Sequence, residues 1–264
     1  MSAGHSLPSA IDRIGEITAA AKGKRLAVFL DYDGTLTPIV DRPQDARLDD
    51  AMRATVARLA TRCMVAIVSG RDLADVHDRV MIANLVYAGS HGFEIAGPGG
   101  LQQVLPEAQK RMPALNDAEQ KLHAALSGVE GALVERKRFT IAVHYRLVRE
   151  ADVPLVDRGV DAALAAHPGL RKRHGKKVFE LQPDVAWDKG AAVRWLLDTL
   201  DLDGPDVLPI YVGDDLTDED AFRALADRGI GVVVLDAPRE TAAGYALRSP
   251  GEVRELLCAL EATR

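Results

Sequence analysis

The sequence predicts an α/β fold: a Rossmann-like doubly wound parallel-sheet core with an inserted smaller α+β cap domain. Short apolar runs recur along the chain, each ending in a polar or glycine cluster, and amphipathic stretches separate them. Continuous hydrophobicity over about five residues is typical of strands covered on both faces. Strands that alternate with helices indicate a parallel sheet with helices on both sides. One central segment departs from this alternation.

The elements of the expected core follow in chain order. The expected strands are Leu26–Leu30, Met64–Val68, Leu85–Ala88, Ile210–Val212 and Gly231–Leu235. The expected helices, which carry apolar residues at helical spacing, are Asp49–Ala60, Gly190–Leu200, Glu219–Asp227 and Glu252–Leu260.

The departing segment covers residues 106–182, so the core is expected to comprise residues 1–105 and 183–264. It contains helical stretches at Glu107–Leu126 and Val153–Ala165, and strand-like stretches at Ala132–Arg146 and Lys177–Leu181. From Phe139 to Arg146 apolar and polar residues alternate, the period of an antiparallel strand with one exposed face.

Composition narrows the possible functions. The chain has 264 residues, 47% of them hydrophobic and 27% charged, which is ordinary for a globular protein with a real core. A net charge of −6 makes electrostatic wrapping of nucleic acid unlikely as the main function. Two cysteines rule out a disulfide framework or a cysteine zinc site. No leader or membrane-spanning run is evident, so a cytoplasmic protein, monomeric or weakly oligomeric, is expected.

A pair of carboxylates follows the first expected strand, in the segment Asp31-Tyr32-Asp33-Gly34. Side chains at i and i+2 of an extended chain point to the same side, and ligands bind at the carboxyl ends of strands in open α/β sheets. Gly34 lets the chain turn sharply there. A polar strand end followed by a turn is the alternative interpretation.

Three further polar groups occupy equivalent places: Ser69 after the second strand, Lys189 at a helix start, and Asp214-Asp215 after a later strand. Each alone fits helix capping or a favourable helix start. Together they match phosphoryl transfer, in which a carboxylate attacks phosphorus and polar groups hold the other oxygens. Mg²⁺ suits such an all-oxygen site.

These segments, in this order, resemble the haloacid dehalogenase superfamily of aspartate-nucleophile phosphatases. The residues 29–39, 89–94 and 213–220 look like those of trehalose-6-phosphate phosphatases. Shorter and looser matches in the insert are Glu135-Arg136-Lys137, His144-Tyr145-Arg146 and the stretch from Gly175 to Glu180. The resemblance implies a Mg²⁺-dependent enzyme that hydrolyses trehalose 6-phosphate to trehalose and phosphate through an aspartyl-phosphate intermediate.

The resemblance also implies individual roles. Asp31 is the expected nucleophile and a metal ligand, Asp33 the general acid and base with a metal-binding backbone carbonyl, and Asp214 the third ligand. Asp215 and Asp218 would orient metal-bound waters, with Thr217 and Asp220 capping the next helix. Ser69 and Lys189 would hold the phosphoryl oxygens. The residues expected to bind the substrate are Arg71, His91, Lys137, His144, Lys176 and Glu180.

Alternatives stay open at this point. The basic run Arg171–Lys177 and the polar residues of the insert also fit an ordinary solvated face. A phosphatase acting on sucrose phosphate or a glycosyl-phosphoglycerate would share the core and the style of insert. A non-catalytic sugar-phosphate sensor is less consistent, because a pure binder needs no nucleophile beside a general acid.

Overall fold

The computed structural model describes residues 7–263. The chain divides into a larger unit, with residues up to Gln102 and from Trp187 onward, and a smaller unit, Gln103–Ala186. The smaller unit extends beyond the expected 106–182 at both ends. At its C-terminal end this is because the Asp184 N–H donates to the Gly169 carbonyl, 2.9 Å away, within the smaller unit.

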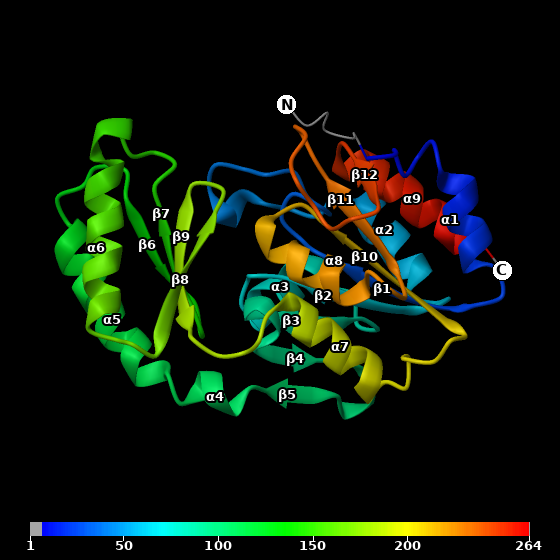
Figure 1. The fold of residues 1–264 in the computed structure, drawn as a ribbon, viewed down its shortest axis with the longest axis horizontal. Helices are drawn as coiled ribbons and strands as arrows, with labels where there is room; N and C mark the ends of the chain where they lie inside the picture. Colours follow the sequence, from blue (N-terminus) through cyan, green and yellow to red (C-terminus); the bar gives the residue numbers. More distant parts are fainter. Residues whose placement is uncertain (1–6, 264) are drawn as a thin grey trace. The chain divides into compact units, whose positions relative to one another are not determined.

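Within the described residues an eight-stranded sheet has the order β12-β11-β10-β1-β2-β3-β4-β5 (Figure 1). It forms the centre of the larger unit, and only its edge strand β5 crosses the division between the two units. The pairs from β12 to β3 are parallel, and β4 runs antiparallel to β3. The strands are β1 Arg25–Leu30, β2 Met64–Val68, β3 Val86–Gly89, β4 Glu94–Ala96, β5 Gln102–Val104, β10 Val207–Gly213, β11 Ile230–Val234 and β12 Tyr245–Leu247.

All five expected core strands are present, as β1, β2, β3, β10 and β11. The parallel, doubly wound core is thus confirmed. The sequence analysis missed β4, β5 and β12. Each has three residues and is too short to show a hydrophobic period.

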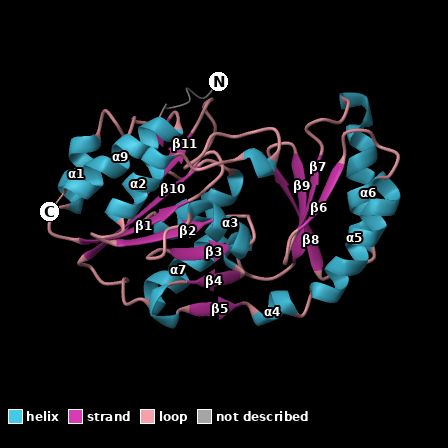
Figure 2. Ribbon diagram, turned by 180° about the vertical axis from the view of Figure 1, so that it is seen from behind, coloured by secondary structure: helices cyan, strands magenta, loops and turns pink. Residues whose placement is uncertain are grey.

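Helices cover both faces of this sheet (Figure 2). They are α1 Ile14–Ala21, α2 Asp50–Leu59, α3 Leu73–Val80, α7 Lys189–Thr199, α8 Glu219–Leu225 and α9 Pro250–Ala262. Val28 and Leu30 of β1 pack in one core with α1, α2, α3 and α9. Ala27 and Phe29 pack in a second core with α7 and α8. Burial on both faces explains why the strand is apolar without alternation.

The smaller unit has a four-stranded antiparallel sheet in the order β6-β7-β9-β8. The strands are β6 Leu133–Arg136, β7 Ile141–His144, β8 Leu170–Gly175 and β9 Val178–Pro183, and the helices are α4 Pro106–Gln109, α5 Met112–Leu126 and α6 Val153–Ala165. Side chains of α5 and α6 pack on one face of this sheet, around Ile141, Val143 and Leu181. The result is an α+β unit, as expected.

Three details of the smaller unit differ from the expectations. The single helix expected over Glu107–Leu126 is broken between α4 and α5, with Pro113 in the first turn of α5. The strand expected over Ala132–Arg146 is a hairpin of β6 and β7, closed by a hydrogen bond from Lys137 N to Thr140 O. Its second face is not uniformly exposed, since Thr140 and Ala142 are fully buried. The short Ala142 side chain lies between Glu135 and Glu180 in the register.

The basic run Arg171–Lys177 forms most of β8 and the turn after it. Lys172 points to one side, where it pairs with Asp157 and Asp161 of α6. Arg171 and Arg173 lie on the other side of the strand, opposite Gln182 and Glu180 in the register. Tertiary pairing therefore makes most of this run a strand of the sheet, with side chains that are partly or fully exposed.

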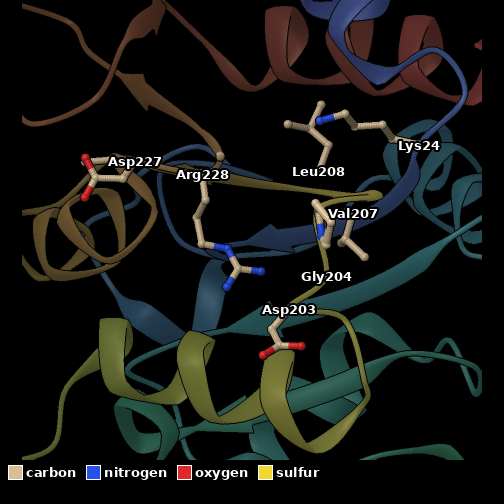
Figure 3. Close-up of a pocket in the computed structure, with 10 residues that line it drawn as sticks. Lys24, Asp203, Gly204, Val207, Leu208, Asp227 and Arg228 are labelled. Atoms are coloured by element: carbon tan, nitrogen blue, oxygen red, sulfur yellow. The ribbon is translucent and has the colours of Figure 1, made fainter.

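A surface groove of about 580 Å³ lies at the amino ends of the strands, whereas Asp31, Ser69 and Asp214 follow the carboxyl ends (Figure 3). Lys24 precedes β1, Val207 begins β10 and Gly229 precedes β11, so the groove is at the amino ends of these strands. Across residues 7–263, no helix combines the length and the apolar character needed to span a bilayer.

Candidate active site

The candidate site lies at the carboxyl ends of three adjacent strands of the larger unit. Asp31 follows β1, Ser69 follows β2 and Asp214 follows β10. Because β1 pairs with both β10 and β2, these three residues come together although they are far apart in sequence. The Asp31 N–H donates to the Val212 carbonyl at 2.9 Å, which continues the sheet up to the carboxylate.

Lys189 links two of the carboxylates. Its Nζ donates to Asp31 Oδ1 and to Asp218 Oδ1, each at 2.7 Å, and all three side chains are buried. Lys189 is the first residue of α7, whose start is capped by Asp188 accepting from the Ala191 N–H at 2.8 Å. The cap thus fixes the helix end that presents the lysine to the site.

Asp218 is saturated by hydrogen bonds. Oδ1 also accepts from Tyr211 Oη at 2.6 Å, and Oδ2 accepts from the N–H groups of Asp214 and Asp215 at 3.0 and 2.9 Å. Asp218 therefore shapes the loop that carries Asp214 and anchors Lys189. Asp215 and Asp218 form a capping box at the start of the 3-10 turn Leu216–Asp218, which leads into α8. The capping role expected for Thr217 and Asp220 stays a prediction.

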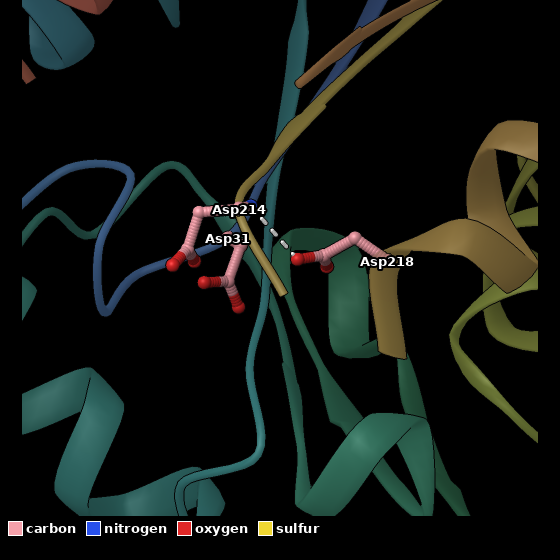
Figure 4. Close-up of side chains that lie close together, drawn as sticks. All are labelled: Asp31, Asp214 and Asp218. Atoms are coloured by element: carbon pink, nitrogen blue, oxygen red, sulfur yellow. Dashed lines mark hydrogen bonds between the residues drawn. The ribbon is translucent and has the colours of Figure 1, made fainter. Parts of the chain in front are cut away.

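Asp31, Asp214 and Asp218 offer carboxylate oxygens within 4.8 Å of one another (Figure 4). The lysine, the tyrosine and two N–H groups already engage Asp218, which leaves Asp31 and Asp214 as the pair suited to a cation. Gly34 has φ +83°, and a Cβ there would lie 2.2 Å from Asp214 Oδ2, so the chain passes as close to this carboxylate as a glycine permits. All-oxygen donors of this kind fit Mg²⁺.

Burial and charge set the ionisation of the buried groups. Desolvation raises the pKa of Asp31 well above its usual range, against the opposing effect of the Lys189 ammonium, and Asp218 and Asp214 raise it further. For Lys189 burial disfavours the ammonium, but Asp218 and Asp31 outweigh burial and raise its pKa well above the usual value. The neighbouring carboxylates therefore favour the ammonium form of the lysine.

Asp33 occupies a different environment from Asp31. Its side chain is 42% exposed, and both of its oxygens accept from Arg71, from Nε and Nη2 at 2.7 Å each. Two carboxylates two residues apart, one buried against a lysine and one partly exposed against an arginine, are suited to two different tasks.

Ser69 is buried and lies beside a segment of unusual backbone conformation. Ser90, His91 and Gly92 all have positive φ, of 49°, 59° and 90°, and for the two non-glycine residues this is strained. The His91 N–H donates to Ser69 O at 2.9 Å, and the Ser90 N–H donates to Arg71 O at 2.7 Å. The N–H groups of the left-handed turn thus hold the carbonyls of the Ser69 loop.

His91 itself packs over the same loop. Its ring is buried, and a Cβ at Gly70 would lie 2.9 Å from His91 Cε1. Only glycine at position 70 lets the imidazole approach the Ser69 loop this closely. The substrate-binding role expected for His91 stays a prediction.

Two residues that hold the Asp214 loop were missed in the sequence analysis. Arg239, in the loop after β11, donates from Nη2 to the carbonyls of Asp214 and Asp215 at 3.3 Å. Buried Glu219 holds this loop by pairing with Arg239 and accepting from the Ala242 N–H at 2.8 Å. No local pattern marks Arg239, because Asp214 and Asp215 lie 25 and 24 residues away in sequence.

The smaller unit brings together three of the predicted substrate-binding residues on one face of its sheet. Lys137 Nζ donates to Glu180 Oε1 at 3.1 Å, and His144 Nε2 lies 2.7 Å from Glu135 Oε2. Lys176 lies apart from them, exposed in the turn between β8 and β9, where its carbonyl accepts from Arg146 at 3.1 Å.

The doubly wound sheet, with an Asp-x-Asp pair, a serine, a lysine and a second aspartate pair at its strand ends, defines a hydrolase of the haloacid dehalogenase class. A solved structure of the trehalose-6-phosphate phosphatase C-terminal domain of C. albicans has the same fold, with a TM-score of 0.83 and 23% identity, covering 99% of this chain and 100% of that one.

The trehalose-phosphatase family model matches residues 29–251. A probable trehalose-phosphate phosphatase of Oryza sativa subsp. japonica is 43% identical over 95% of this chain and 73% of its own length. A trehalose 6-phosphate phosphatase of Zea mays is 42% identical, with the same coverage of 95% and 73%. The chain therefore belongs to the trehalose-phosphatase family, which confirms the family indicated by the motifs.

Proposed function

We propose that this chain is a phosphoric monoester hydrolase that converts trehalose 6-phosphate to trehalose and inorganic phosphate. The observation that carries this proposal is the buried Asp31, which Lys189 holds at 2.7 Å beside Asp214 in a chain of the trehalose-phosphatase family. A carboxylate placed so can attack a phosphoryl group that the lysine and a cation help to bind.

In the first step an Asp31 oxygen forms a bond to phosphorus while the bond between phosphorus and the sugar oxygen breaks. A sugar alkoxide is a poor leaving group, so Asp33 delivers a proton to that oxygen as it departs. The Lys189 ammonium and the Ser69 hydroxyl bind phosphoryl oxygens during the transfer. The products are trehalose and a phosphorylated Asp31.

In the second step water attacks phosphorus, and Asp33 accepts a proton from it. The bond from phosphorus to Asp31 breaks, which regenerates the carboxylate and releases inorganic phosphate. Throughout both steps Asp218 keeps Lys189 and the Asp214 loop in place through its hydrogen bonds.

The residues that would hold Mg²⁺ are Asp31, Asp214 and the backbone carbonyl of Asp33. When bound, the ion offsets the repulsion between the carboxylates and the substrate phosphate. Arg239 and Asp218 keep the Asp214 loop in one conformation from its two sides, through its carbonyls and its N–H groups. This support favours a site that is organised before the substrate arrives.

Recognition of the sugar is assigned to the polar face of the smaller unit, with Lys137, His144 and Glu180 as the residues that bind hydroxyl groups. The nucleophile, acid and phosphate ligands serve any phosphate monoester alike, so discrimination has to come from groups that reach the sugar. Carboxylate, ammonium and imidazole groups on one sheet face provide donors and acceptors for hydroxyls.

A phosphate-release screen tests the proposal. Wild type and Asp31→Asn are assayed with trehalose 6-phosphate, sucrose phosphate and a glycosyl-phosphoglycerate, with Mg²⁺ and with EDTA. We expect strong preference for trehalose 6-phosphate, loss with EDTA, and a decrease of several orders of magnitude in Asp31→Asn. Preference for another ester would reassign the substrate, and tight binding without release would indicate a sensor.

A further inference from the structure

Arg71 is almost completely buried, and its guanidinium joins three segments of the larger unit. It donates to both oxygens of Asp33, to Asp75 Oδ2 at 2.8 Å and to the Pro43 carbonyl at 2.7 Å. Its Cζ also lies 5.3 Å from the centroid of the Tyr32 ring. The strand end after β1, the loop before α2 and helix α3 thus meet at one side chain.

These partners engage most of the donors of Arg71. A guanidinium carries five N–H groups, and four hydrogen bonds to oxygens of the protein use them, one from Nε, one from Nη1 and two from Nη2. The pairing with Asp33 is bidentate, which fixes the plane of that carboxylate as well as its position. Arg71 is therefore placed to hold Asp33, and the substrate-binding role that the sequence analysis expected for it stays a prediction.

The far end of this contact is itself braced. Asp75 Oδ1 accepts from Arg79 Nε at 2.8 Å, and Arg79 Nη1 donates to the Ala46 carbonyl at 2.7 Å. Arg71 and Arg79 lie on opposite sides of Asp75, and both also hold the loop of residues 43–46. Asp33, Arg71, Asp75 and Arg79 thus form a continuous chain of ion pairs that connects Asp33 to helix α3.

We propose that Arg71 is a positioning residue for the reaction, acting through Asp33 and braced by Asp75. This inference rests on the proposed function, in which Asp33 delivers a proton to the leaving oxygen. Proton delivery requires the carboxyl group within hydrogen-bond reach of that oxygen. The Asp33 side chain is 42% exposed, and the two hydrogen bonds from Arg71 fix the position of its carboxyl group.

The expected signature is a dependence on the leaving group. General acid catalysis contributes roughly 10²–10⁴-fold when the leaving group is poor and little when it is good. Arg71→Met, which keeps the length and removes the fork, should slow the first step with trehalose 6-phosphate roughly 10²-fold. With 4-nitrophenyl phosphate the same step should slow less than about tenfold.

The experiment measures single-turnover burst rates in the Mg²⁺-loaded protein with trehalose 6-phosphate, glycerol phosphate, phenyl phosphate and 4-nitrophenyl phosphate. The variants are Arg71→Met, Arg71→Lys, Asp75→Asn, Asp33→Asn and the Asp33→Asn/Arg71→Met double variant. Arg53→Met is the matched control, because Arg53 donates only to backbone carbonyls, those of Leu48, Arg79 and Val80, and has no hydrogen bond to Asp33 or Asp75. Thermal unfolding of each variant monitors the fold.

A steeper dependence on the leaving group in Arg71→Met and, more weakly, in Asp75→Asn supports the inference, with partial recovery in Arg71→Lys. Adding Arg71→Met to Asp33→Asn should change the burst less than about threefold, because residues acting as a unit are not additive. Equal loss on all esters with a raised KM would assign Arg71 to phosphate binding and overturn the inference. The inference would also be overturned if Arg71→Met lost activity equally on all esters together with thermal stability, in the same way as Arg53→Met. It would be overturned as well if Arg71→Met lost no activity.

The test separates this inference from the proposed function. If the wild type leaves trehalose 6-phosphate intact, the proposed function fails, but the comparison of glycerol, phenyl and 4-nitrophenyl phosphates still measures the role of Arg71. If trehalose 6-phosphate is hydrolysed and the dependence on the leaving group is unchanged in Arg71→Met, only the inference about Arg71 fails.

Discussion

Replacing Asp218 by asparagine tests whether the buried charge network holds the site together. Asp218 is fully buried and accepts four hydrogen bonds, from Lys189, Tyr211 and the N–H groups of Asp214 and Asp215. An amide keeps the shape but offers one oxygen, so its NH₂ must face either the lysine and tyrosine or the two N–H groups. In either orientation the NH₂ group faces other donors and makes no hydrogen bond with them. The substitution also removes the negative charge that balances Lys189.

The expected loss follows from these contacts. Removing one partner from a buried ion pair destabilises a protein by about 3–5 kcal/mol. At about 2–4 °C per kcal/mol for a chain of this size, this corresponds to a decrease in Tm of roughly 6–20 °C. Tyr211→Phe removes only one neutral donor to the same carboxylate, and we expect it to cost about 1–3 kcal/mol.

Guanidinium chloride unfolding, with the slope m checked for constancy, measures these changes. Asp206→Asn is the control, since Asp206 pairs with Arg25 on the surface, with both side chains more than half exposed, and such pairs add little. A loss in Asp218→Asn as small as that of the control would refute the idea that Asp218 is the structural anchor of the site. A Tyr211→Phe loss exceeding that of Asp218→Asn would also refute it.

Three other changes probe the site and the smaller unit. Glu180→Ala should lower kcat/KM for trehalose 6-phosphate roughly 10²-fold, because a substrate hydroxyl loses its partner, and leave an aryl phosphate nearly unaffected; equal loss on both substrates would make Glu180 a structural residue. Gly34→Ala places a Cβ 2.2 Å from Asp214 Oδ2 at φ +83°, so we expect activity to decrease at least about tenfold and thermal stability to fall. The control Gly99→Ala, at φ +71° with open space around it, should keep full activity. Wild-type rates in Gly34→Ala would contradict the close approach of the chain to Asp214. Millimolar Mg²⁺ should raise the Tm of the wild type, since an ion that binds only the folded state stabilises it, and Asp214→Asn should abolish the increase; an equal increase in both would exclude Asp214 as a ligand.

Much of the core could be predicted because its signals are local. A strand buried on both faces has to be apolar along its whole length, so β1, β2, β3, β10 and β11 are visible as short apolar runs. The segment from Asp31 to Gly34 can be recognised in the same way. Its two carboxylates and its glycine lie within four consecutive positions directly after a buried strand.

What only the tertiary structure decided depends on partners that are distant in sequence. The groups that hold the carboxylates of the candidate site, Arg71 on Asp33 and Arg239 on the Asp214 loop, carry no local pattern, because an arginine donates wherever the fold places an acceptor. The strained turn at Ser90–Gly92 is held by hydrogen bonds from the Ser90 and His91 N–H groups to the carbonyls of Arg71 and Ser69. The alternation in β7 likewise does not reveal that Ala142 is buried between Glu135 and Glu180, which strand register alone brings beside it. The sequence thus indicated which groups are the candidates for the proposed chemistry, through residue types that such a reaction cannot replace. Long-range packing decided how those groups are oriented, because orientation depends on contacts that no window of the sequence contains.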